Sequence, residues 1–274
     1  MTILVVGDLV DDIGVRPLGA VNAASDTVSE IRMTPGGSAA NVAAWLGHLG
    51  APVRFVGRCG ADAVERHTSA LALHGVDARI TGDPELPTAT IVLTLDDEGD
   101  RTMYVDRAAN ATLGAEQLGA DVWDDVTWLH LTGYSFFDDA VRPLALQLVS
   151  QARARGAGVS IDPSSLGFLE AAGHEAVAGW LNEADLVFPN DDEQRFLQLG
   201  GDGVVLTLGP GGARFAGQEI AAIETAVVDT VGAGDAFCAG FLSRWIDGGD
   251  ASASLRAGAE AAAACVAARG ARPQ

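Results

Sequence analysis

Short runs rich in β-branched residues alternate along the chain with longer stretches of helical periodicity. Strands that alternate with helices form parallel sheets, because each helical crossover returns the chain to the same end of the sheet. We therefore expect an α/β fold of three layers, with helices on both faces of a mostly parallel central sheet. The expected strands are ILVVG, VRFVG, VTWLHL, GVSID, DLVFPN and VVLTLG, and the expected helices cover 38–50, 61–75, 138–155, 191–199, 234–247 and 251–268.

Two stretches interrupt this alternation. Residues 26–37 and 89–106 alternate polar and apolar side chains, and the second contains an acidic, glycine-containing turn at 96–100 that predicts a hairpin. We expect a small β lid from about 13–37 and 89–107, within a single domain of residues 1–274. Such a sheet could cover a site or contact a second subunit.

The charge balance limits the classes of partner. The chain has 37 acidic and 17 basic residues, a formal net charge of −20, so we expect neither nucleic acid nor a membrane surface as partner. All the basic residues are arginine, and the absence of lysine excludes Schiff-base chemistry, the Walker A loop and the protein-kinase site. A nucleotide phosphate would have to be held by backbone amides, arginine and metal.

Features of the chain ends and cysteines predict the compartment. The start MTILVVGDLVDD lacks a basic segment and is typical of a first strand rather than a signal peptide. No apolar run reaches the roughly 18 residues of a membrane helix. Cys59, Cys238 and Cys265 lie far apart without CxxC spacing. We expect a reduced, cytoplasmic protein.

The segment DTVGAGDAFCAGF is the first candidate site. Its bare backbone at Gly232–Gly234 stands where a helix is expected to begin, and the first amides of a helix attract anions. Asp235 follows at once and could accept a proton from a hydroxyl that attacks a phosphoryl group. The alternative is a tight turn in which Asp235 caps the helix.

The segment PGGSAANVAAWLGHLG is the second candidate. Gly36 and Gly37 allow close approach to the backbone, and the Asn41 amide could both donate to and accept from a sugar hydroxyl. A helix entry with a buried capping asparagine explains the same residues.

Two further segments follow expected strands. In VFPNDDEQRFL, Asn190 and Glu193 could reach a hydrated Mg²⁺ or a phosphate at the carboxyl edge of the sheet, although a helix capping box uses the same spacing. In LTLGPGGARF, the turn from Gly209 to Gly212 could lie beside a nucleotide or be only a turn.

The order and spacing of these motifs resemble the ribokinase-like, or PfkB, carbohydrate kinase family. The match runs from VVGDLVDD through GGSAANVAAWLGHLGAPVRFVGRCG, VFPNDDE and VVLTLGPGG to DTVGAGDAFCAGFL, which is nearly the whole chain. The resemblance implies an ATP- and Mg²⁺-dependent kinase that transfers the γ-phosphoryl group to a primary hydroxyl of a small-molecule sugar or sugar acid.

The resemblance also implies roles for single residues. Asp235 matches the catalytic base, and the anion hole matches Gly232, Ala233 and Gly234. The positions that hold the hydroxyls of the sugar match Asp12, Gly36, Gly37 and Asn41. The nucleotide side matches Asn190, Thr207, Gly209 and Gly212, and Glu193 matches the residue that helps to place Mg²⁺, through water.

Three features depart from the family pattern or stay open. Ser38 and Val10 stand where ribokinases proper carry lysine and asparagine, so we expect ribose to be a poor substrate. Arg107 could pair with a substrate carboxylate or simply cover the lid. The ending RGARPQ is expected to fall short of the tail that completes a monovalent-cation site in relatives, while Asp229 and the Val231 carbonyl remain candidate ligands, so a requirement for K⁺ stays open.

Two other functions are retained as alternatives. A nucleoside kinase would use the same base and anion hole beside a more aromatic pocket, for which Trp45, Tyr104, Tyr134, Phe136 and Phe137 are candidates. A non-catalytic sugar or nucleotide sensor is disfavoured, because it would not need these motifs intact. The lid of the family often pairs two subunits, so a homodimer through the lid is the assembly that the resemblance implies.

Overall fold

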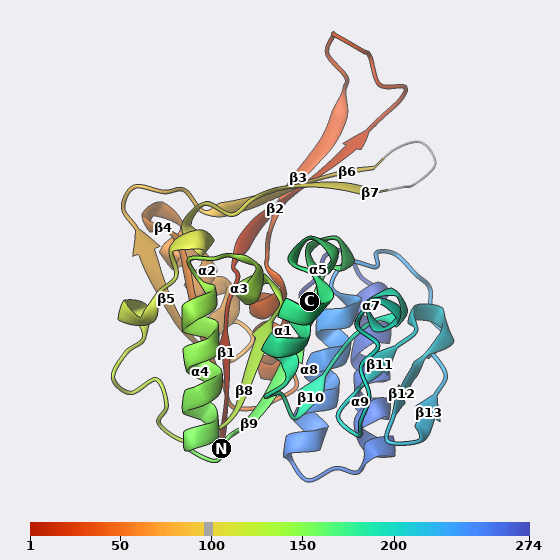
Figure 1. The fold of residues 1–274 in the computed structure, drawn as a ribbon. Helices are drawn as coiled ribbons and strands as arrows, with labels where there is room; N and C mark the ends of the chain where they lie inside the picture. Colours follow the sequence, from red (N-terminus) through yellow and green to blue (C-terminus); the bar gives the residue numbers. More distant parts are fainter. Residues whose placement is uncertain (96–100) are drawn as a thin grey trace.

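The computed structural model describes residues 1–95 and 101–274, and its central feature is a parallel sheet (Figure 1). Within these residues the sheet has six strands in the order β10-β9-β8-β1-β4-β5, and all neighbours are parallel. The expected parallel sheet is confirmed. Its strands are β1 (Thr2–Val6), β4 (Val53–Gly60), β5 (Asp77–Asp83), β8 (Val126–Thr132), β9 (Gly158–Asp162) and β10 (Leu186–Val187).

Helices cover both faces of this sheet because the buried strands are apolar on both sides. On β1, Ile3 and Val5 belong to one core cluster and Leu4 and Val6 to the other. Burying one such side chain contributes about 1.5–3 kcal/mol, so each face holds a helix layer firmly. The first layer contains α1 (Ser38–His48), α2 (Val64–Ala72), α8 (Ala233–Ile246) and α9 (Ala251–Val266); the second contains α3 (Tyr134–Phe137), α4 (Arg142–Ala154), α5 (Leu166–Ala172), α6 (His174–Leu181) and α7 (Asp191–Leu197).

A second sheet stands off the main body (Figure 1). It has the order β3-β2-β6-β7 and is formed by β2 (Val10–Pro17), β3 (Ser29–Gly36), β6 (Ala89–Leu95) and β7 (Arg101–Asp106). We call this sheet the lid. Strand β2 begins at Val10 rather than at 13, because Val10 already pairs with Gly36 and Ala89. The hairpin turn expected at 96–100 lies outside the described residues.

The two faces of the lid differ in their surroundings. Asp12 is in register with Thr34 on β3 and with Ile91 on β6, so these side chains share the face that lines a cavity. The neighbouring register positions Met33 and Tyr104 lie on the opposite face, where they are 59% and 62% exposed.

Parts of the fold differ from the sequence prediction. The segment VVLTLG extends the parallel sheet only through single bridges, because β11 (Leu206–Thr207) pairs antiparallel with β12 (Ala213–Phe215), which in turn pairs with β13 (Gln218–Ile220). Expected helix 138–155 begins late, at Arg142, with Pro143 in the first turn, where proline is tolerated. Expected helix 61–75 starts as a short 3₁₀ turn, η1 (Ala61–Ala63).

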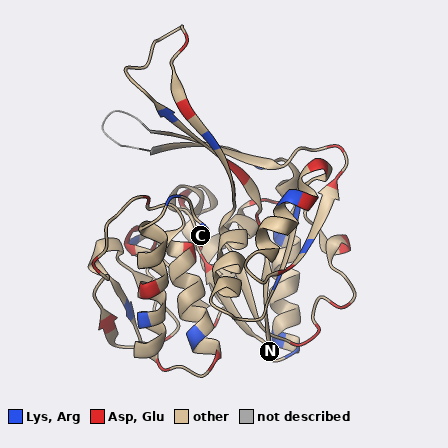
Figure 2. Ribbon diagram, turned by 180° about the vertical axis from the view of Figure 1, so that it is seen from behind, with Lys and Arg blue, Asp and Glu red and all other residues tan. Residues whose placement is uncertain are grey.

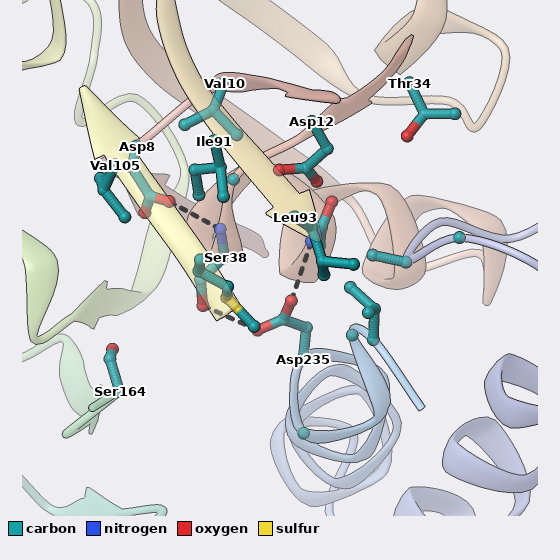
Figure 3. Close-up of a pocket in the computed structure, with 18 of the residues that line it drawn as sticks. Asp8, Val10, Asp12, Thr34, Ser38, Ile91, Leu93, Val105, Ser164 and Asp235 are labelled. Atoms are coloured by element: carbon teal, nitrogen blue, oxygen red, sulfur yellow. Dashed lines mark hydrogen bonds between the residues drawn. The ribbon is translucent and has the colours of Figure 1, made fainter. Parts of the chain in front are cut away.

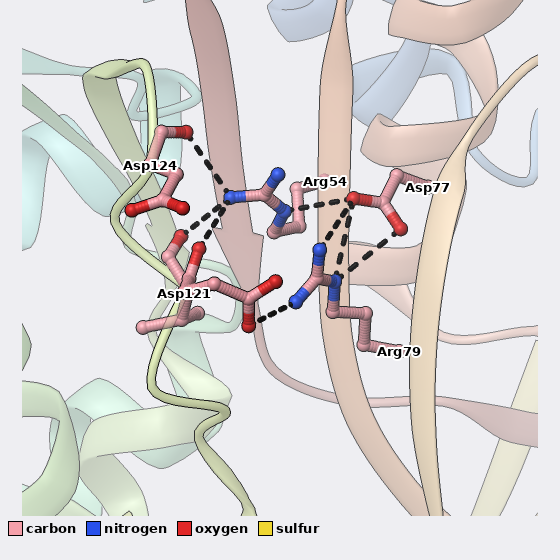
Figure 4. Close-up of polar contacts among 6 residues, drawn as sticks. Arg54, Asp77, Arg79, Asp121 and Asp124 are labelled. Carbon is pink, nitrogen blue, oxygen red and sulfur yellow. Dashed lines mark hydrogen bonds and ion pairs between the residues drawn. The ribbon is translucent and has the colours of Figure 1, made fainter.

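Arginines fix the end of the sheet opposite the cavity (Figure 4). Arg54, near the start of β4, donates to the Asp77 carboxylate at 2.8 Å and to the carbonyl groups of Asp121 and Asp124 at 3.0 and 3.2 Å. Arg79 on β5 bonds both Asp77 and Asp121. The Arg54 side chain is only 12% exposed, so these bonds hold the loop that enters β8 against the edge strands.

Charged residues are distributed over the lid, the loops and the body. Figure 2 shows aspartate and glutamate on each of these parts, so the negative charge is not confined to one element. In the part of the chain that the structure describes, no helix is both long enough and apolar enough to cross a membrane.

Candidate active site

A cavity of about 1060 Å³ lies at the carboxyl edge of the parallel sheet, beneath the lid (Figure 3). Asp8, Asp162 and Asn190, which follow or end β1, β9 and β10, line its floor, and Ile91 and Leu93 line it from the lid. Parallel sheets bind ligands at this edge, because loops from several strands converge there and leave polar groups exposed.

Asp235 lies in the first turn of α8 and is held by two side chains of α1 (Figure 3). Its Oδ1 accepts a hydrogen bond from the Ser38 hydroxyl at 2.7 Å, and its Oδ2 accepts one from the Asn41 amide at 2.9 Å. Burial raises the pKa of Asp235 to about 7, although these two hydrogen bonds lower it. A carboxyl with a pKa near neutrality exchanges protons readily at physiological pH.

The two glycines before Asp235 differ in what surrounds them. Gly232 has φ +78°, and a Cβ there would stand 2.5 Å from the Cβ of Ala271, so the fold itself requires glycine. Gly234 has helical geometry, and a Cβ there would meet no atom within 4 Å beyond its own turn of helix. Because Gly234 lines the cavity beside the first amides of α8, its missing side chain leaves room for a ligand.

The entrance of α1 brings two aspartates together. The Asp8 carboxylate accepts from the backbone N–H of Ser38 at 2.7 Å and of Ala39 at 3.1 Å, so it caps α1. A Cβ on Gly36 would lie 1.9 Å from an Asp12 carboxylate oxygen, and one on Gly37, where φ is +96°, would lie 2.6 Å from the Asp8 carbonyl.

Asp12 faces the cavity above this entrance. Burial and the nearby Asp8 raise the pKa of Asp12 to about 6. Gly37, Asn41 and Asp12 line the cavity, whereas Gly36 lies beneath Asp12 and is not among the lining residues. Asp8 was not among the site residues expected from the sequence, although an acid just after the first parallel strand was a signal for it.

Asn190 and Glu193 form the capping box of α7. The Asn190 side chain accepts from the Glu193 N–H at 2.9 Å, and a Glu193 carboxylate oxygen accepts from the Asn190 N–H at 2.9 Å. Both residues also line the cavity, so the motif forms a helix cap and lies at the site at the same time.

A second buried carboxyl lies close to Glu193. Burial raises the pKa of Glu193, and burial together with the charges of Glu193 and Asp235 raises the pKa of Asp162 well above its ordinary value. Asp162 ends β9 at the carboxyl edge, a signal that the sequence analysis did not use. Neighbouring carboxyls whose charged forms are disfavoured in this way create a demand for positive charge.

The acidic groups suit a hydrated cation better than a fully protein-bound one. Among residues 1–95 and 101–274 no group of three or more His, Cys, Asp or Glu side chains is arranged to hold a metal ion. Mg²⁺ typically keeps several waters and is held by one or two carboxylates plus substrate phosphates. Asp162 and Glu193 fit that requirement.

The expected nucleotide-side residues are only partly brought to the cavity. Thr207 lines it, and its backbone N–H donates to the Pro189 carbonyl at 3.0 Å. Gly209 and Gly212 lie in and after the turn η4 (Gly209–Gly211) and are not among the residues that line it. A Cβ on Gly212 would stand 1.9 Å from the Ile220 carbonyl oxygen, so chain packing explains this glycine.

The remaining candidates line the cavity but already have protein contacts. The Asp229 carboxylate accepts from the backbone N–H groups of Val231 and Gly270, both at 3.1 Å, and the Val231 carbonyl lies 3.4 Å from the Cys265 Sγ.

Arg107 also lines the cavity, where it contacts the segment after β8. It donates to the Tyr134 carbonyl at 3.0 Å, and its Nε lies 3.5 Å from the Asp138 carboxylate. The guanidinium charge therefore already has a protein carboxylate within reach.

The parallel sheet, the two helix layers and the β lid over the cavity make up a ribokinase-like fold. Among solved structures, an uncharacterized sugar kinase from Pyrococcus horikoshii matches with a TM-score of 0.87 at 21% identity, covering 100% of this chain and 95% of that one. The structure of a fructokinase with bound ATP from Xylella fastidiosa matches with a TM-score of 0.85 at 24% identity, covering 99% and 95%.

The sequence model of the pfkB family of carbohydrate kinases matches residues 2–274. A fructokinase from Vibrio alginolyticus is 30% identical over 248 residues, which are 81% of this chain and 80% of the fructokinase. The chain belongs to the pfkB family, and it is an ATP-dependent carbohydrate kinase.

Proposed function

We propose that the enzyme transfers the γ-phosphoryl group of ATP to a primary hydroxyl of a sugar, with Asp235 as the catalytic base. The observation that carries this proposal is the Asp235 carboxyl group, which lines the cavity at the start of α8 and has a pKa of about 7. A base with a pKa near the working pH combines a useful ionised fraction with adequate basicity.

The proposed step is an in-line displacement. Asp235 accepts the proton of the acceptor hydroxyl while the oxygen of that hydroxyl bonds to the γ-phosphorus of ATP. The bond from the γ-phosphorus to the bridging oxygen breaks, and ADP leaves. The first amides of α8, at Gly232, Ala233 and Gly234, stabilise the charge on the transferred group. The open space at Gly234 supports this placement.

Mg²⁺ would be held near Asp162 and Glu193, and when bound it would neutralise the phosphate charge. Asn190 and Thr207 line the same side of the cavity and are assigned to the phosphates and the nucleotide. Because Gly209 and Gly212 do not line this cavity, any contact between them and the nucleotide would be made through the turn as a whole.

The acceptor side lies under the lid. Asp12 and Asn41 present a carboxylate and an amide to the sugar hydroxyls, and Gly37 brings the backbone close. The apolar side chains of Ile91 and Leu93 cover the same space (Figure 3). Apolar cover excludes water, which would otherwise compete with the sugar for the phosphoryl group.

The surroundings favour a neutral hexose over a sugar acid. Arg107 is already occupied by Asp138 and the Tyr134 carbonyl, so it has less reason to bind a substrate carboxylate. The relative from Vibrio alginolyticus is named a fructokinase, which agrees with a ketohexose. Ser38 and Val10, in place of longer polar side chains, argue against ribose.

A nucleoside kinase remains the second candidate, because Tyr134 and Phe168 line the cavity and their rings lie 6.0 Å apart. The nucleobase of a nucleoside could stack on such rings.

We also propose a homodimer through the exposed face of the lid and a K⁺ site near Asp229 and Val231.

A coupled assay of ADP release tests the proposal. The panel contains D-fructose, other hexoses, D-ribose, 2-keto-3-deoxy acids and nucleosides, each with MgATP, and calorimetry measures binding in parallel. We expect the highest kcat/KM with a neutral hexose and a poor one with ribose. Highest turnover of a nucleoside would select the second candidate, and binding without any turnover would favour a sensor.

A further inference from the structure

The C-terminal segment brings a guanidinium to the back of the proposed site. Arg272 donates from Nε to the Asn41 Oδ1 at 3.2 Å and from Nη2 to the Gly36 carbonyl at 2.9 Å. Its Nη1 is buried and has no hydrogen-bond partner among the described residues. Arg272 lies behind Asn41 and is not itself among the residues that line the cavity, although its neighbour Ala271 is.

Three contacts hold this segment in place. The Gly270 N–H donates to the Asp229 carboxylate at 3.1 Å, and the Trp45 indole N–H donates to the Ala271 carbonyl at 2.8 Å. Ala271 also packs directly against Gly232, where a Cβ would come within 2.5 Å. The position of Arg272 is therefore set by contacts with α1, with the start of α8 and with the loop before α8.

The hydrogen bonds from Arg272 to Asp235 form a chain that has only one direction. A guanidinium can only donate, so the Asn41 Oδ1 has to face Arg272. The Nδ2 group of the same amide then faces Asp235, whose ionised carboxylate can only accept. Without Arg272, the Asn41 amide could turn when Asp235 is protonated, because the carboxylic acid could then donate to the amide oxygen.

The charge of Arg272 acts on the same groups. Burial lowers the pKa of Arg272 to about 10, so it stays protonated at neutral pH, and its charge opposes the rise in the pKa of Asp12. In a chain without lysine, Arg272 therefore places a positive charge behind the aspartates of the site. The titratable groups that interact electrostatically with Arg272 or with Asp235 are Asp8, Asp11, Asp12, His67, His74, Tyr134, Asp162, Cys238 and Cys265.

We propose that Arg272 is a positioning residue for phosphoryl transfer: it locks the Asn41 amide that holds Asp235, and it supplies positive charge behind the acidic acceptor site. This inference rests on the proposed role of Asp235 as the base. Arg272 touches neither substrate nor reacting atoms, so it acts through Asn41 and through its field.

The test compares Arg272→Met, Arg272→Lys and Arg256→Gln. Arg256 is exposed on α9 and provides a matched loss of charge. For Arg272→Met we expect kcat to fall about tenfold or more, with KM values within about threefold, and the acidic limb of the kcat–pH profile to move upward by about half a unit or more. Arg272→Lys keeps the charge, so its limb stays near that of the wild type while kcat remains reduced. Arg256→Gln changes neither.

A double-mutant cycle and one reference variant complete the test. Because Arg272 acts through Asn41, the kcat losses of Asn41→Ala and Arg272→Met should be less than additive. An unmoved acidic limb in Arg272→Met, or full additivity, would overturn the inference. If Arg272→Met does not fold, the same cycle with Arg272→Lys gives the decision. Asp235→Asn is assayed alongside. If this variant keeps its activity, the proposed function fails. If it loses activity while the Arg272 variants behave like the control Arg256→Gln, only the inference about Arg272 is overturned.

Discussion

Substituting the two glycines before Asp235 separates a fold requirement from a ligand requirement. Gly232→Ala places a side chain on a residue in the left-handed backbone conformation, which costs about 1–2 kcal/mol of stability. Its Cβ would also collide with the Cβ of Ala271 at 2.5 Å, which adds about 1–3 kcal/mol. At about 2–4 °C per kcal/mol for a chain near this size, the thermal midpoint should fall by roughly 5 °C or more.

Gly234→Ala should have the opposite profile. Its Cβ meets no atom within 4 Å beyond its own turn of helix, and the backbone is helical, so the substitution should be neutral or stabilise the protein by up to about 1 kcal/mol. The same methyl group stands in the cavity beside the first amides of α8, where it keeps an anion from approaching. Because losing one such donor costs about 10²–10³-fold, we expect kcat/KM to fall by about that factor.

Calorimetric thermal midpoints and steady-state kinetics with MgATP and the best sugar of the panel measure both effects. Each variant serves as the control for the other, since they lie two residues apart on the same turn. A Gly234→Ala enzyme that keeps kcat/KM within about threefold of the wild type, or that loses as much thermal stability as Gly232→Ala, would refute the separate roles of the two glycines.

Three further outcomes follow from the structure. Glu193→Gln can still accept from the Asn190 N–H, so the capping box persists while the Mg²⁺ concentration for half-maximal rate rises more than the sugar KM; equal changes in both would contradict the placement of Mg²⁺. Tyr104→Glu together with Met33→Glu places charge on the exposed face of the lid and should convert a dimer to a monomer in sedimentation velocity; a monomeric wild type at assay concentrations would remove the dimer proposal. The folded-state pKa of Asp235 is raised to about 7 from 3.8, so the folded protein binds this proton more tightly than the unfolded chain, and the contribution of Asp235 to the free energy of unfolding falls as pH rises from about 4 to 7. Asp235→Asn should therefore be more stable to heat than the wild type at pH 8 but not at pH 4. An equal difference at both pH values would argue against the raised pKa.

The local motifs of the site could be predicted from the sequence because their physics is local. A bare backbone and an acid at a helix start identify the Gly232–Asp235 turn whatever surrounds it, and the Asn190–Glu193 spacing specifies a capping box. The parallel sheet was predictable for a similar reason, since strand and helix periods differ strongly.

The other groups of the site depend on contacts across the chain. Arg272 meets Asn41 from 231 positions away, and no local pattern marks that pairing. Asp162 gains its significance only because α7 brings Glu193 beside it. At Gly212 the glycine has a packing reason that the sequence does not reveal, because a Cβ there would meet the Ile220 carbonyl oxygen, and the residue does not line the cavity. Strands of three residues, such as β12 and β13, are too short to show a period.

The central claim is that Asp235 accepts the proton of the acceptor hydroxyl, and Asp235→Asn tests it most directly. Asparagine can turn its oxygen to the Asn41 amide and its NH₂ group to the Ser38 hydroxyl, so the two hydrogen bonds at 2.9 and 2.7 Å can persist while the base is lost. The measurement is kcat with MgATP and saturating sugar, together with the affinities for both ligands and the thermal midpoint. The structure predicts a fall in kcat of about a hundredfold or more with binding retained and the thermal midpoint unchanged or raised. A folded Asp235→Asn enzyme with near-normal kcat would contradict the role of Asp235 as the base.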